Sequence, residues 1–362
     1  MSRTRTLDGT TILVCGGAGF IGSNFIRHIR GKYPHARIVN YDKLTYSGNR
    51  DNLKDFASDK RYFFVKGDVA DAKGVARVFK KFKPEYVINF AAETHVDRSI
   101  HVGALEFIRT NVEGVFHLLE AVKACGAIKY VQVSTDEVYG ALPLGSRSAF
   151  TESTPFAPNV PYAATKAGGD LLCRAYHSTW GVPVVVTHCS NNFGPYQYPE
   201  KLIPYFVTRI LEGKKLPLYG DGKHVRDWIH VLDHCEALEL CLVKGKPGAV
   251  YNIGADNELD NRDIAERILA HFQKDHSWLE FVADRPGHDR HYAIDNTLIT
   301  KELGWKPRRN FERAFAETIE WYKENTTWVD HVRKRTGVFN PHIDLWRAHA
   351  KKSLKKSKKH TV

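Results

Sequence analysis

The feature that most constrains this chain is a glycine-rich segment that follows its first apolar run. That run, at 11–15, leads directly into Gly16-Gly17-Ala18-Gly19-Phe20-Ile21-Gly22. Glycines at these intervals let a chain turn tightly from a strand into a helix and keep its backbone close to a phosphate group. The helix N-terminus then offers N–H donors and the positive end of the helix dipole. An ordinary turn is the alternative, so the surrounding sequence must distinguish the two.

Up to about residue 190, short β-branched runs alternate with longer amphipathic segments, which is typical of a parallel sheet covered by helices. Strands are expected at 11–15, 37–41, 62–66, 86–90, 130–134 and 182–188. Helices are expected at 20–31, 72–81, 104–125 and 162–180. The predicted fold class is therefore α/β, a Rossmann-type doubly wound parallel sheet with helices on both faces.

Beyond residue 190 the expected elements are shorter, and proline and glycine are frequent, as at Pro195, Pro199 and Gly220. This change predicts a smaller C-terminal α/β lobe that faces the substrate. The expected organisation is a dinucleotide-binding domain at 9–190, a substrate-binding lobe at 191–330 that partly interleaves with it, and a basic tail at 331–362.

The second expected strand is followed by Asp42, twenty residues after Gly22. At that distance an acid accepts hydrogen bonds from the ribose hydroxyls of a dinucleotide, and its charge repels a 2′-phosphate, so NAD is favoured over NADP. Asp68, after the third strand, is placed to meet the edge of the adenine ring. The fourth expected strand ends in Phe90-Ala91-Ala92, and the small alanine side chains there leave room for the cofactor to lie close to the backbone.

Tyr162 and Lys166 begin the expected helix at 162–180. Residues four apart lie on the same face of a helix, so the two side chains are expected to be neighbours. The lysine ammonium and the positive nicotinamide should lower the pKa of the phenol, so that tyrosinate takes a proton from a substrate hydroxyl. This spacing is common by chance, but it carries weight when it follows a dinucleotide motif.

Thr135, Asp136 and Glu137 follow the expected strand at 130–134. Thr135 can hydrogen-bond the hydroxyl that is oxidised. Two adjacent carboxyl groups raise each other's pKa, so one could remain protonated as a general acid while the other acts as a base. A solvated acidic turn is the alternative. His95 and Arg98, after the fourth strand, are expected to be structural rather than catalytic.

The formal net charge of +12 suggests nucleic-acid binding, but most of it is confined to one segment. Residues 331–362 contain ten Lys and Arg against one acid, whereas the remaining 330 residues carry 43 basic and 40 acidic side chains. A block of like charge is usually solvated. We therefore expect a solubilising tail, with contact to nucleic acid or an anionic surface as the alternative for the tail alone.

The six cysteines are scattered without a C-x-x-C pair, and most lie in apolar runs. This pattern predicts reduced, buried thiols in a cytoplasmic protein and makes a zinc or other metal site unlikely. No run of 18 apolar residues predicts a transmembrane span, and the polar N-terminus lacks the apolar segment of a signal peptide.

With these motifs the chain resembles the extended short-chain dehydrogenases, and among them the dTDP-glucose 4,6-dehydratases. The resemblance spans about residues 9–325. It is carried by the segments 42–49, 91–99, 134–140, 162–166, 190–196, 199–204, 219–223, 226–228, 251–254 and 284–289. Within this family pattern, sugar epimerases lack the Asp136–Glu137 pair, and UDP-glucuronate decarboxylases and GDP-mannose dehydratases keep only its glutamate.

The resemblance implies conversion of dTDP-glucose to dTDP-4-keto-6-deoxyglucose through bound NAD. In this mechanism Tyr162 removes the O4 proton while C4 is oxidised. Glu137 then abstracts the C5 proton, Asp136 protonates the C6 hydroxyl, and water leaves. The hydride taken from C4 returns to C6, so there is no net oxidation. The resemblance also implies a homodimer formed by a helix pair that includes the helix at 162–180.

The resemblance extends the sets of binding residues. The implied cofactor-binding set is Gly16, Gly19, Phe20, Ile21, Gly22, Asp42, Lys43, Leu44, Thr45, Asp68, Val69, Phe90, Ala91, Ala92, Thr94, Thr110, Tyr162, Lys166 and Asn192, with Thr94, Thr110 and Asn192 on the nicotinamide side. The implied substrate-binding set is Thr94, Thr135, Asn191, Lys201, Leu202, Pro217, Tyr219, Arg226, Asn261, Arg285 and His288. Arg226 and Arg285 suit a diphosphate, because a guanidinium offers paired donors.

The chain departs from the family pattern at a few positions. Ala163 and Thr165 stand where serines are common, His188 where asparagine is common, and His291 where arginine is common. These differences bear on the base and sugar recognised rather than on the reaction type. A 4,6-dehydratase of UDP-glucose or another UDP-hexose therefore stays open, as does a non-catalytic NAD-sensing protein, although the latter would be expected to lose the tyrosine–lysine or acid pair.

Overall fold

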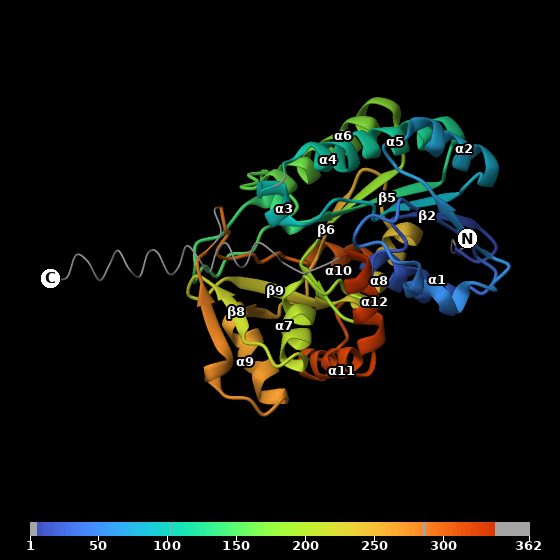
Figure 1. The fold of residues 1–362 in the computed structure, drawn as a ribbon. Helices are drawn as coiled ribbons and strands as arrows, with labels where there is room; N and C mark the ends of the chain where they lie inside the picture. Colours follow the sequence, from blue (N-terminus) through green and yellow to red (C-terminus); the bar gives the residue numbers. More distant parts are fainter. Residues whose placement is uncertain (1–5, 102, 285–286, 337–362) are drawn as a thin grey trace.

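A seven-stranded parallel sheet forms the centre of the structure, a computed structural model that describes residues 6–101, 103–284 and 287–336 (Figure 1). The strand order is β10-β6-β5-β4-β1-β2-β3. The strands are β1 (Thr11–Cys15), β2 (Arg37–Asp42), β3 (Tyr62–Lys66), β4 (Tyr86–Asn89), β5 (Lys129–Thr135), β6 (Val184–Cys189) and β10 (Val250–Ile253). The order reverses between β1 and β4, which is the position where ligands bind in doubly wound sheets.

The predicted fold class is confirmed, and the six strands predicted from the sequence are present with bounds that differ by at most two residues at either end. β1, β4, β5 and β6 are almost entirely buried, as expected of strands covered on both faces. β10 was not predicted. It pairs with β6 in parallel and so returns a segment from beyond residue 190 to the large sheet.

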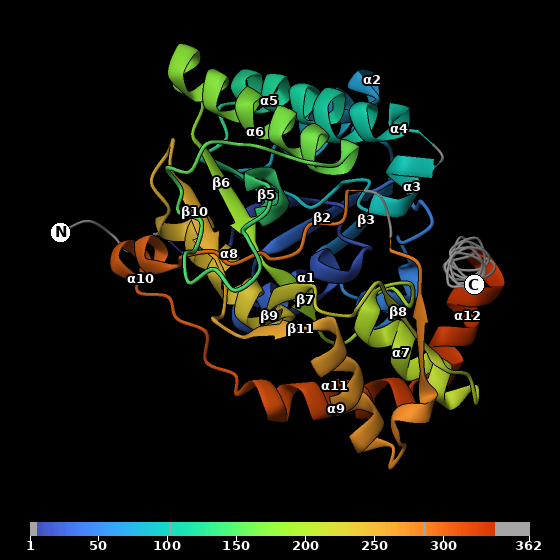
Figure 2. The ribbon, with the colours of Figure 1, turned by 90° about the vertical axis from the view of Figure 1, so that its left-hand side faces the viewer.

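Helices cover both faces of this sheet (Figure 2). One face carries α1 (Phe20–Lys32), α8 (Val231–Lys244) and α10 (Thr297–Leu303), and the other carries α2 (Ala72–Phe82), α5 (Gly114–Cys125) and α6 (Pro161–Trp180). Each face has its own apolar core: Phe25 and Leu238 belong to the first, Leu118 and Cys173 to the second. Burial of these two layers holds the strand ends in fixed positions.

The single helix predicted at 104–125 is interrupted in the structure. It consists of α4 (Leu105–Ile108), a π-helical turn (Arg109–Glu113) and α5. Asn111 in that turn donates to the Glu93 carbonyl oxygen and to Thr165 Oγ1, at 3.0 Å each. A Cβ at Gly169 would lie 2.5 Å from the Asn111 carbonyl oxygen, so the turn also brings α6 unusually close. A π-helical turn contains one residue more than an α-helical turn. The long-range contacts of Asn111 stabilise this turn, and helical periodicity could not reveal it.

The remaining elements build a smaller α/β lobe. Its strands are β7 (Asn191–Phe193), β9 (Val225–His230) and β11 (Glu258–Asp260) in one sheet, and β8 (Leu216–Tyr219) with β12 (Leu279–Val282) in another. Its helices are α7 (Leu202–Leu211), α9 (Asn261–His271), α11 (Phe311–Glu324) and α12 (Thr326–Thr336), while the short helix α3 (Val96–His101) follows β4 and lies next to the helical layer of α4 and α6. Short 3₁₀ helices are η1 (Arg50–Phe56), η3 (Asp136–Tyr139) and η4 (His276–Trp278). The domain boundaries proposed from the sequence stay predictions.

All six cysteines are free, and five are buried, which agrees with the thiols expected from the sequence. In the part of the chain that the structure describes, no helix is long and apolar enough to cross a membrane. The first residues assigned to the basic tail, up to 336, continue α12, and the rest of the tail lies outside the described residues. Its role and the cytoplasmic location stay predictions.

Candidate functional site

Three adjoining cavities lie at the carboxyl ends of the sheet strands, where ligands bind in this class of fold. The glycine cavity, about 510 Å³, is lined by Gly16, Asp42 and Asp68. The central cavity, about 1230 Å³, contains the predicted catalytic residues. The distal cavity, about 970 Å³, lies against the smaller lobe. The first two share Gly16 and Gly19.

The glycine-rich turn is packed so tightly that side chains are excluded from it. Gly16 has φ +74°, and a Cβ there would lie 2.6 Å from the Ala91 backbone nitrogen. A Cβ at Gly22 would lie 2.4 Å from the Gly16 carbonyl oxygen. No side chain caps the N-terminus of α1, where Gly19 is the N-cap. The first N–H groups of α1 therefore have no side-chain acceptor and suit an anionic ligand; phosphate binding at this turn stays a prediction.

Asp42 is buried beside this turn and lines the glycine cavity. Its Oδ2 accepts a hydrogen bond from the Ala18 amide at 2.9 Å, and its Oδ1 accepts one from the Leu44 amide at 2.7 Å. Burial raises the pKa of this carboxyl, and the two backbone hydrogen bonds lower it. Each carboxylate oxygen has a second acceptor position, so Asp42 can still receive hydroxyl donors.

Three neighbouring predictions have different outcomes. Asp68 lines the same cavity as Asp42, and its Oδ2 pairs with Lys43 Nζ at 2.7 Å. Thr110 lines the glycine cavity and not the central one, and its place on the nicotinamide side stays a prediction. Leu44 lines none of the three cavities. It has φ +58°, and it contributes its amide to Asp42 rather than its side chain to a ligand.

The acid pair lies in η3, directly after β5. Asp136 is only 2% exposed; Thr135 Oγ1 donates to its Oδ1 at 3.3 Å, and its Oδ2 has no hydrogen-bond partner among the described residues. Burial, followed by the charge of Glu137, raises the pKa of Asp136 well above its ordinary value, whereas Arg226 opposes the shift. Burial therefore favours the protonated form of Asp136, and its 2% exposure excludes a solvated acidic turn at this residue.

Tyr162 and Lys166 line the central cavity together with Thr135, Asp136 and Glu137. Both side chains are buried. Burial, then the charge of Glu137, raises the pKa of Tyr162, and a hydrogen bond with Thr135 lowers it. The sequence had predicted a lowered pKa for this phenol. The direction differs because burial of the phenol itself is the largest cause of the shift, and burial could not be read from the sequence.

The predicted cofactor-binding residues other than Leu44 line the glycine cavity, the central cavity or both. The predicted substrate-binding residues gather further along, in the distal cavity. It is lined by Asn191, Lys201, Leu202, Pro217, Tyr219, Arg226, Asn261 and His288, whereas Thr94 and Thr135 line the central cavity. Arg285 lies outside the described residues. Glu137, Asn191 and Lys201 line both the central and the distal cavity, so a ligand could extend from one into the other.

Arg226 is buried, so it is not an ordinary surface charge. Its guanidinium lies 4.2 Å from the centre of the Tyr292 ring and donates to the carbonyl oxygens of Val225 and Asp289. Stacking of this kind fixes a guanidinium in one orientation. Lys201 is half-buried and donates to the Thr94 carbonyl oxygen at 3.3 Å.

Sequence reasoning missed a buried ion pair at the boundary of these cavities. His95 Nε2 lies 3.2 Å from Glu200 Oε2, and both side chains are buried. Glu200 lines the central and distal cavities, and His95 lines the distal one. The position of Glu200 immediately before Lys201 was the available signal. Its partner is more than a hundred residues away, which no local pattern reveals.

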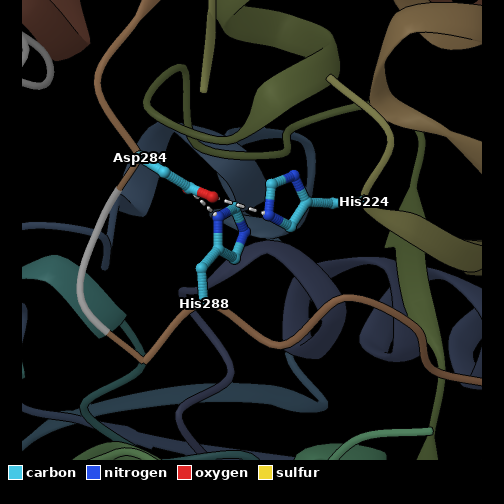
Figure 3. A group of neighbouring side chains, drawn as sticks. All are labelled: His224, Asp284 and His288. Atoms are coloured by element: carbon cyan, nitrogen blue, oxygen red, sulfur yellow. Dashed lines mark hydrogen bonds and ion pairs between the residues drawn. The ribbon is translucent and has the colours of Figure 1, made fainter. Parts of the chain in front are cut away.

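His224, Asp284 and His288 form a cluster beside the distal cavity (Figure 3). Asp284 lies 2.6 Å from His288 Nδ1 and 3.1 Å from His224 Nε2. The two imidazole rings are stacked, with centroids 3.6 Å apart and planes inclined by 16°. Ring nitrogen lone pairs lie in the ring planes, so nearly parallel rings do not converge on one ion. The cluster suits hydrogen bonding to Asp284 better than metal ligation, and the absence of a metal site stays a prediction.

Most of the chain is similar to known dTDP-glucose 4,6-dehydratases. A crystal structure of dTDP-glucose 4,6-dehydratase from Bacillus anthracis, in complex with NAD, is 49% identical, with a TM-score of 0.83 over 89% of this chain and 99% of that one. The corresponding enzyme from Streptomyces venezuelae is 47% identical, with a TM-score of 0.85 over the same shares. A dTDP-glucose 4,6-dehydratase of Xanthomonas campestris is 47% identical over 340 residues, 89% of this chain and 95% of that protein.

The sequence model of the family described as GDP-mannose 4,6 dehydratase matches residues 13–318. That range contains the glycine turn, the acid pair and the tyrosine–lysine pair. The similarity to the three proteins above extends over almost their whole length. The chain therefore belongs to the GDP-mannose 4,6 dehydratase family.

Proposed function

We propose that this protein is an NAD-dependent nucleotide-sugar 4,6-dehydratase that converts dTDP-glucose to dTDP-4-keto-6-deoxyglucose. The observation that carries the proposal is the position of Glu137, which lines both the central and the distal cavity beside the buried Asp136, whose pKa burial raises. A sugar bound there would have an acid and a base on its C5–C6 side. The Asp136–Glu137 pair and the names of the similar proteins both favour dTDP-glucose over GDP-mannose.

The residues of the glycine and central cavities fit NAD. The turn at Gly16 and Gly22 leaves no room for a Cβ, which suits a pyrophosphate that lies against the backbone. Asp42 would hold the adenosine ribose, and its negative charge would repel a 2′-phosphate. When bound, NAD accepts the hydride of C4 and later returns it to C6, so the reaction has no net oxidation.

The side chains of this chain would move the protons. Thr135 would hydrogen-bond the C4 hydroxyl, and Tyr162, with Lys166 beside it, would take the O4 proton. The resulting C4 carbonyl acidifies the C5 proton, which Glu137 removes. Asp136 would then protonate the C6 oxygen, and the C6–O bond would break to release water. When the hydride returns to C6, Glu137 would give its proton back to C5, which completes the 4-keto-6-deoxy product. Burial keeps Asp136 protonated until that step.

The diphosphate and nucleoside would occupy the distal cavity. Arg226 offers a guanidinium held over Tyr292, and Lys201 lies at the boundary with the central cavity. Both suit a diphosphate between the sugar and the nucleoside. Tyr219, Asn261 and His288 line the same cavity further from the sugar.

The test is to incubate the purified protein with dTDP-glucose and, separately, with UDP-glucose, and to measure the 4-keto product. We expect turnover of dTDP-glucose to be faster. Thymine and uracil differ by one methyl group, whose recognition contributes only about 1–3 kcal/mol, so a UDP-hexose is the nearest alternative substrate. Absence of a keto product from either sugar would contradict the proposal.

A non-catalytic NAD sensor is a less favoured function, because such a protein has no need of Tyr162, Lys166, Asp136 and Glu137 in one cavity. NAD binding without turnover of any nucleoside-diphosphate hexose would favour it. If a variant without residues 351–362 turned over substrate at the unchanged rate, any contact with nucleic acid would be confined to the tail.

The proposal includes a homodimer formed through the helical layer of α4, α5 and α6. Large apolar side chains are exposed on this layer: Leu105, Ile108, Phe116, Leu171 and Trp180 are between 41% and 61% exposed. α6 contacts α4 and α5, so these residues share one side of the sheet. A second copy of this chain would bury them against the same layer.

A further inference from the structure

A buried polar network lies beneath the candidate catalytic residues. Asp170 of α6, Ser134 of β5, His188 of β6, Tyr139 of η3 and Asn252 of β10 are each at most 4% exposed. None of the five was assigned a role by the reaction scheme above. The network nevertheless touches the two elements that carry the proposed chemistry, because η3 holds the acid pair and α6 holds the tyrosine–lysine pair.

The position of one proton in this network follows from the orientation of Asn252. Its Nδ2 donates to the Phe150 carbonyl oxygen at 3.0 Å, so its Oδ1 faces Tyr139 and must receive a donor. Tyr139 Oη, 2.9 Å away, supplies that donor with its single proton. The same Oη lies 2.7 Å from His188 Nδ1. Because its proton is already used, the hydroxyl can only accept there, and Nδ1 carries a proton.

The other ring nitrogen of His188 faces a carboxylate. Nε2 lies 3.2 Å from Asp170 Oδ2, which also accepts from Ser134 Oγ at 2.5 Å. Asp170 Oδ2 is thus an acceptor for a proton on Nε2, and a ring that carries protons on both nitrogens is positive. Glu152 also lies near the ring: burial raises the pKa of its carboxyl, and the charge of His188 opposes that shift. Two carboxyl groups therefore favour a positive ring at this buried position.

We propose that His188 is a positioning residue, which as an imidazolium joins Tyr139 of η3 to Asp170 of α6. The inference rests on the proposed function. This link would fix the spacing between the acid pair, which lies on η3, and the tyrosine–lysine pair, which lies on α6. Groups that face the ring are Asp170 and, beyond it, Lys166 on α6, Ser134 on β5, Tyr139 on η3, Asn252 on β10, and Glu152 and Phe156 on the loop before α6.

A His188→Asn variant is expected to affect the two half-reactions unequally. Asparagine is common at this position in the family that the chain resembles, but among the partners present here it can reach only some and brings no charge. We therefore expect η3 to loosen while Tyr162 and Lys166 stay on an intact helix. Water loss should slow by up to about 100-fold, the effect of roughly 1 Å of misplacement, whereas oxidation at C4 should slow much less. Single-turnover measurements of nicotinamide absorbance and of the dehydrated product separate the two steps.

The charge is tested without substrate. Nitrogen NMR of ring-labelled protein, about one unit above the ordinary imidazole pKa of roughly 6.5, should show both His188 nitrogens protonated. His234 is the internal reference, because burial lowers its pKa to about 3 and its ring is neutral. Asp170→Asn should make the His188 ring neutral as well. An unprotonated nitrogen in the wild-type His188 ring would overturn the inference even if the variants fail to fold.

The kinetic control is His271→Asn, a half-exposed histidine on α9 whose partner is Glu320, which should leave both steps unchanged. Equal slowing of both steps in His188→Asn, or no slowing, would overturn the positioning role. A wild-type protein that does not turn over dTDP-glucose would remove the proposed function instead, and the NMR measurement would still decide whether the charged ring exists.

Discussion

Lys166 Nζ donates a 2.7 Å hydrogen bond to the carbonyl oxygen of Val133. The contact ties the first half of α6 to β5, two residues before Thr135. An ammonium has three N–H donors, so two remain for the central cavity that Lys166 also lines. The lysine is thus held by the same strand that delivers the acid pair.

Replacement of this ammonium should change the pH dependence of turnover. Lys166→Met keeps the buried stem but removes the positive charge, so the pKa of Tyr162, already raised by burial, should rise further. Tyr162 acts as a base only when deprotonated, and the acidic limb of kcat/KM should therefore move to higher pH. At neutral pH we expect a loss of about 100-fold or more. An unmoved acidic limb would show that the lysine does not act on Tyr162.

Glu137→Gln should separate oxidation from elimination. The amide cannot take the C5 proton, whereas Tyr162 and Lys166 are untouched, so C4 oxidation should survive and water loss should fail. The measurement is nicotinamide absorbance after one equivalent of dTDP-glucose, together with a product assay. We expect reduced nicotinamide to persist on the protein. Ordinary turnover by this variant would remove Glu137 from its proposed role.

Asp136→Asn should stabilise the protein at neutral pH while it abolishes activity. Burial raises the folded-state pKa of Asp136, so the folded state holds a proton that the unfolded state releases above about pH 3.9. Stability is therefore lost as pH rises from that value to the folded pKa, by about 1.4 kcal/mol for each unit. The variant should lack this loss. Urea unfolding between pH 5 and 8 should show a stability gain that grows with pH; a constant difference would argue against the buried proton.

Gly22→Ala should weaken NAD binding, because its Cβ would lie 2.4 Å from the Gly16 carbonyl oxygen and 2.8 Å from Gly17 Cα. Both contacts are backbone and cannot move without opening the turn. We expect at least a tenfold rise in Kd, about 1.4 kcal/mol, by calorimetry. Gly31→Ala, at the other end of α1 with no atom within 4 Å, is the matched control. It should keep NAD affinity and stabilise the helix by up to about 1 kcal/mol. If Gly22→Ala and Gly31→Ala bound NAD with equal affinity, the glycine turn would not be a cofactor-binding element.

Leu171→Glu should convert the proposed dimer to monomers. The side chain is 55% exposed on α6, and a carboxylate facing its counterpart across a two-fold interface would be buried without a partner. Sedimentation velocity measures the result. Phe281→Glu on β12, where the side chain is 52% exposed but lies in the other lobe, should leave the oligomeric state unchanged. A wild-type monomer, or an unaffected Leu171 variant, would exclude this interface.

The sequence was most informative where a local pattern has a local cause. The alternation of buried strands and amphipathic helices placed six strands of the large sheet to within one or two residues. The glycine turn was recognisable because only glycine tolerates its close backbone contacts. Tyr162 and Lys166 could be paired because helical spacing alone puts them on one face. Their gathering in one cavity with Asp136 then follows from strands that end at the same edge.

Features that depend on contacts distant in sequence could not be foreseen. The π-helical turn exists because Asn111 reaches Glu93 and Thr165. Glu200 became a site residue only through its position opposite His95. Leu44 was assigned by the family resemblance, whereas its positive φ and the hydrogen bond from its amide to Asp42 could not be read from the sequence. The direction of the Tyr162 pKa shift also required a three-dimensional burial that sequence cannot give.

The return of β10 to the large sheet has a consequence during synthesis on the ribosome. β6 pairs with β5 on one side and with β10 on the other, and β10 ends at Ile253. A nascent chain that has emerged only to residue 190 must therefore present β6 as an open edge. Translation products that stop before β10 should recruit chaperones and aggregate, whereas chains that extend past it close the sheet and should escape both fates.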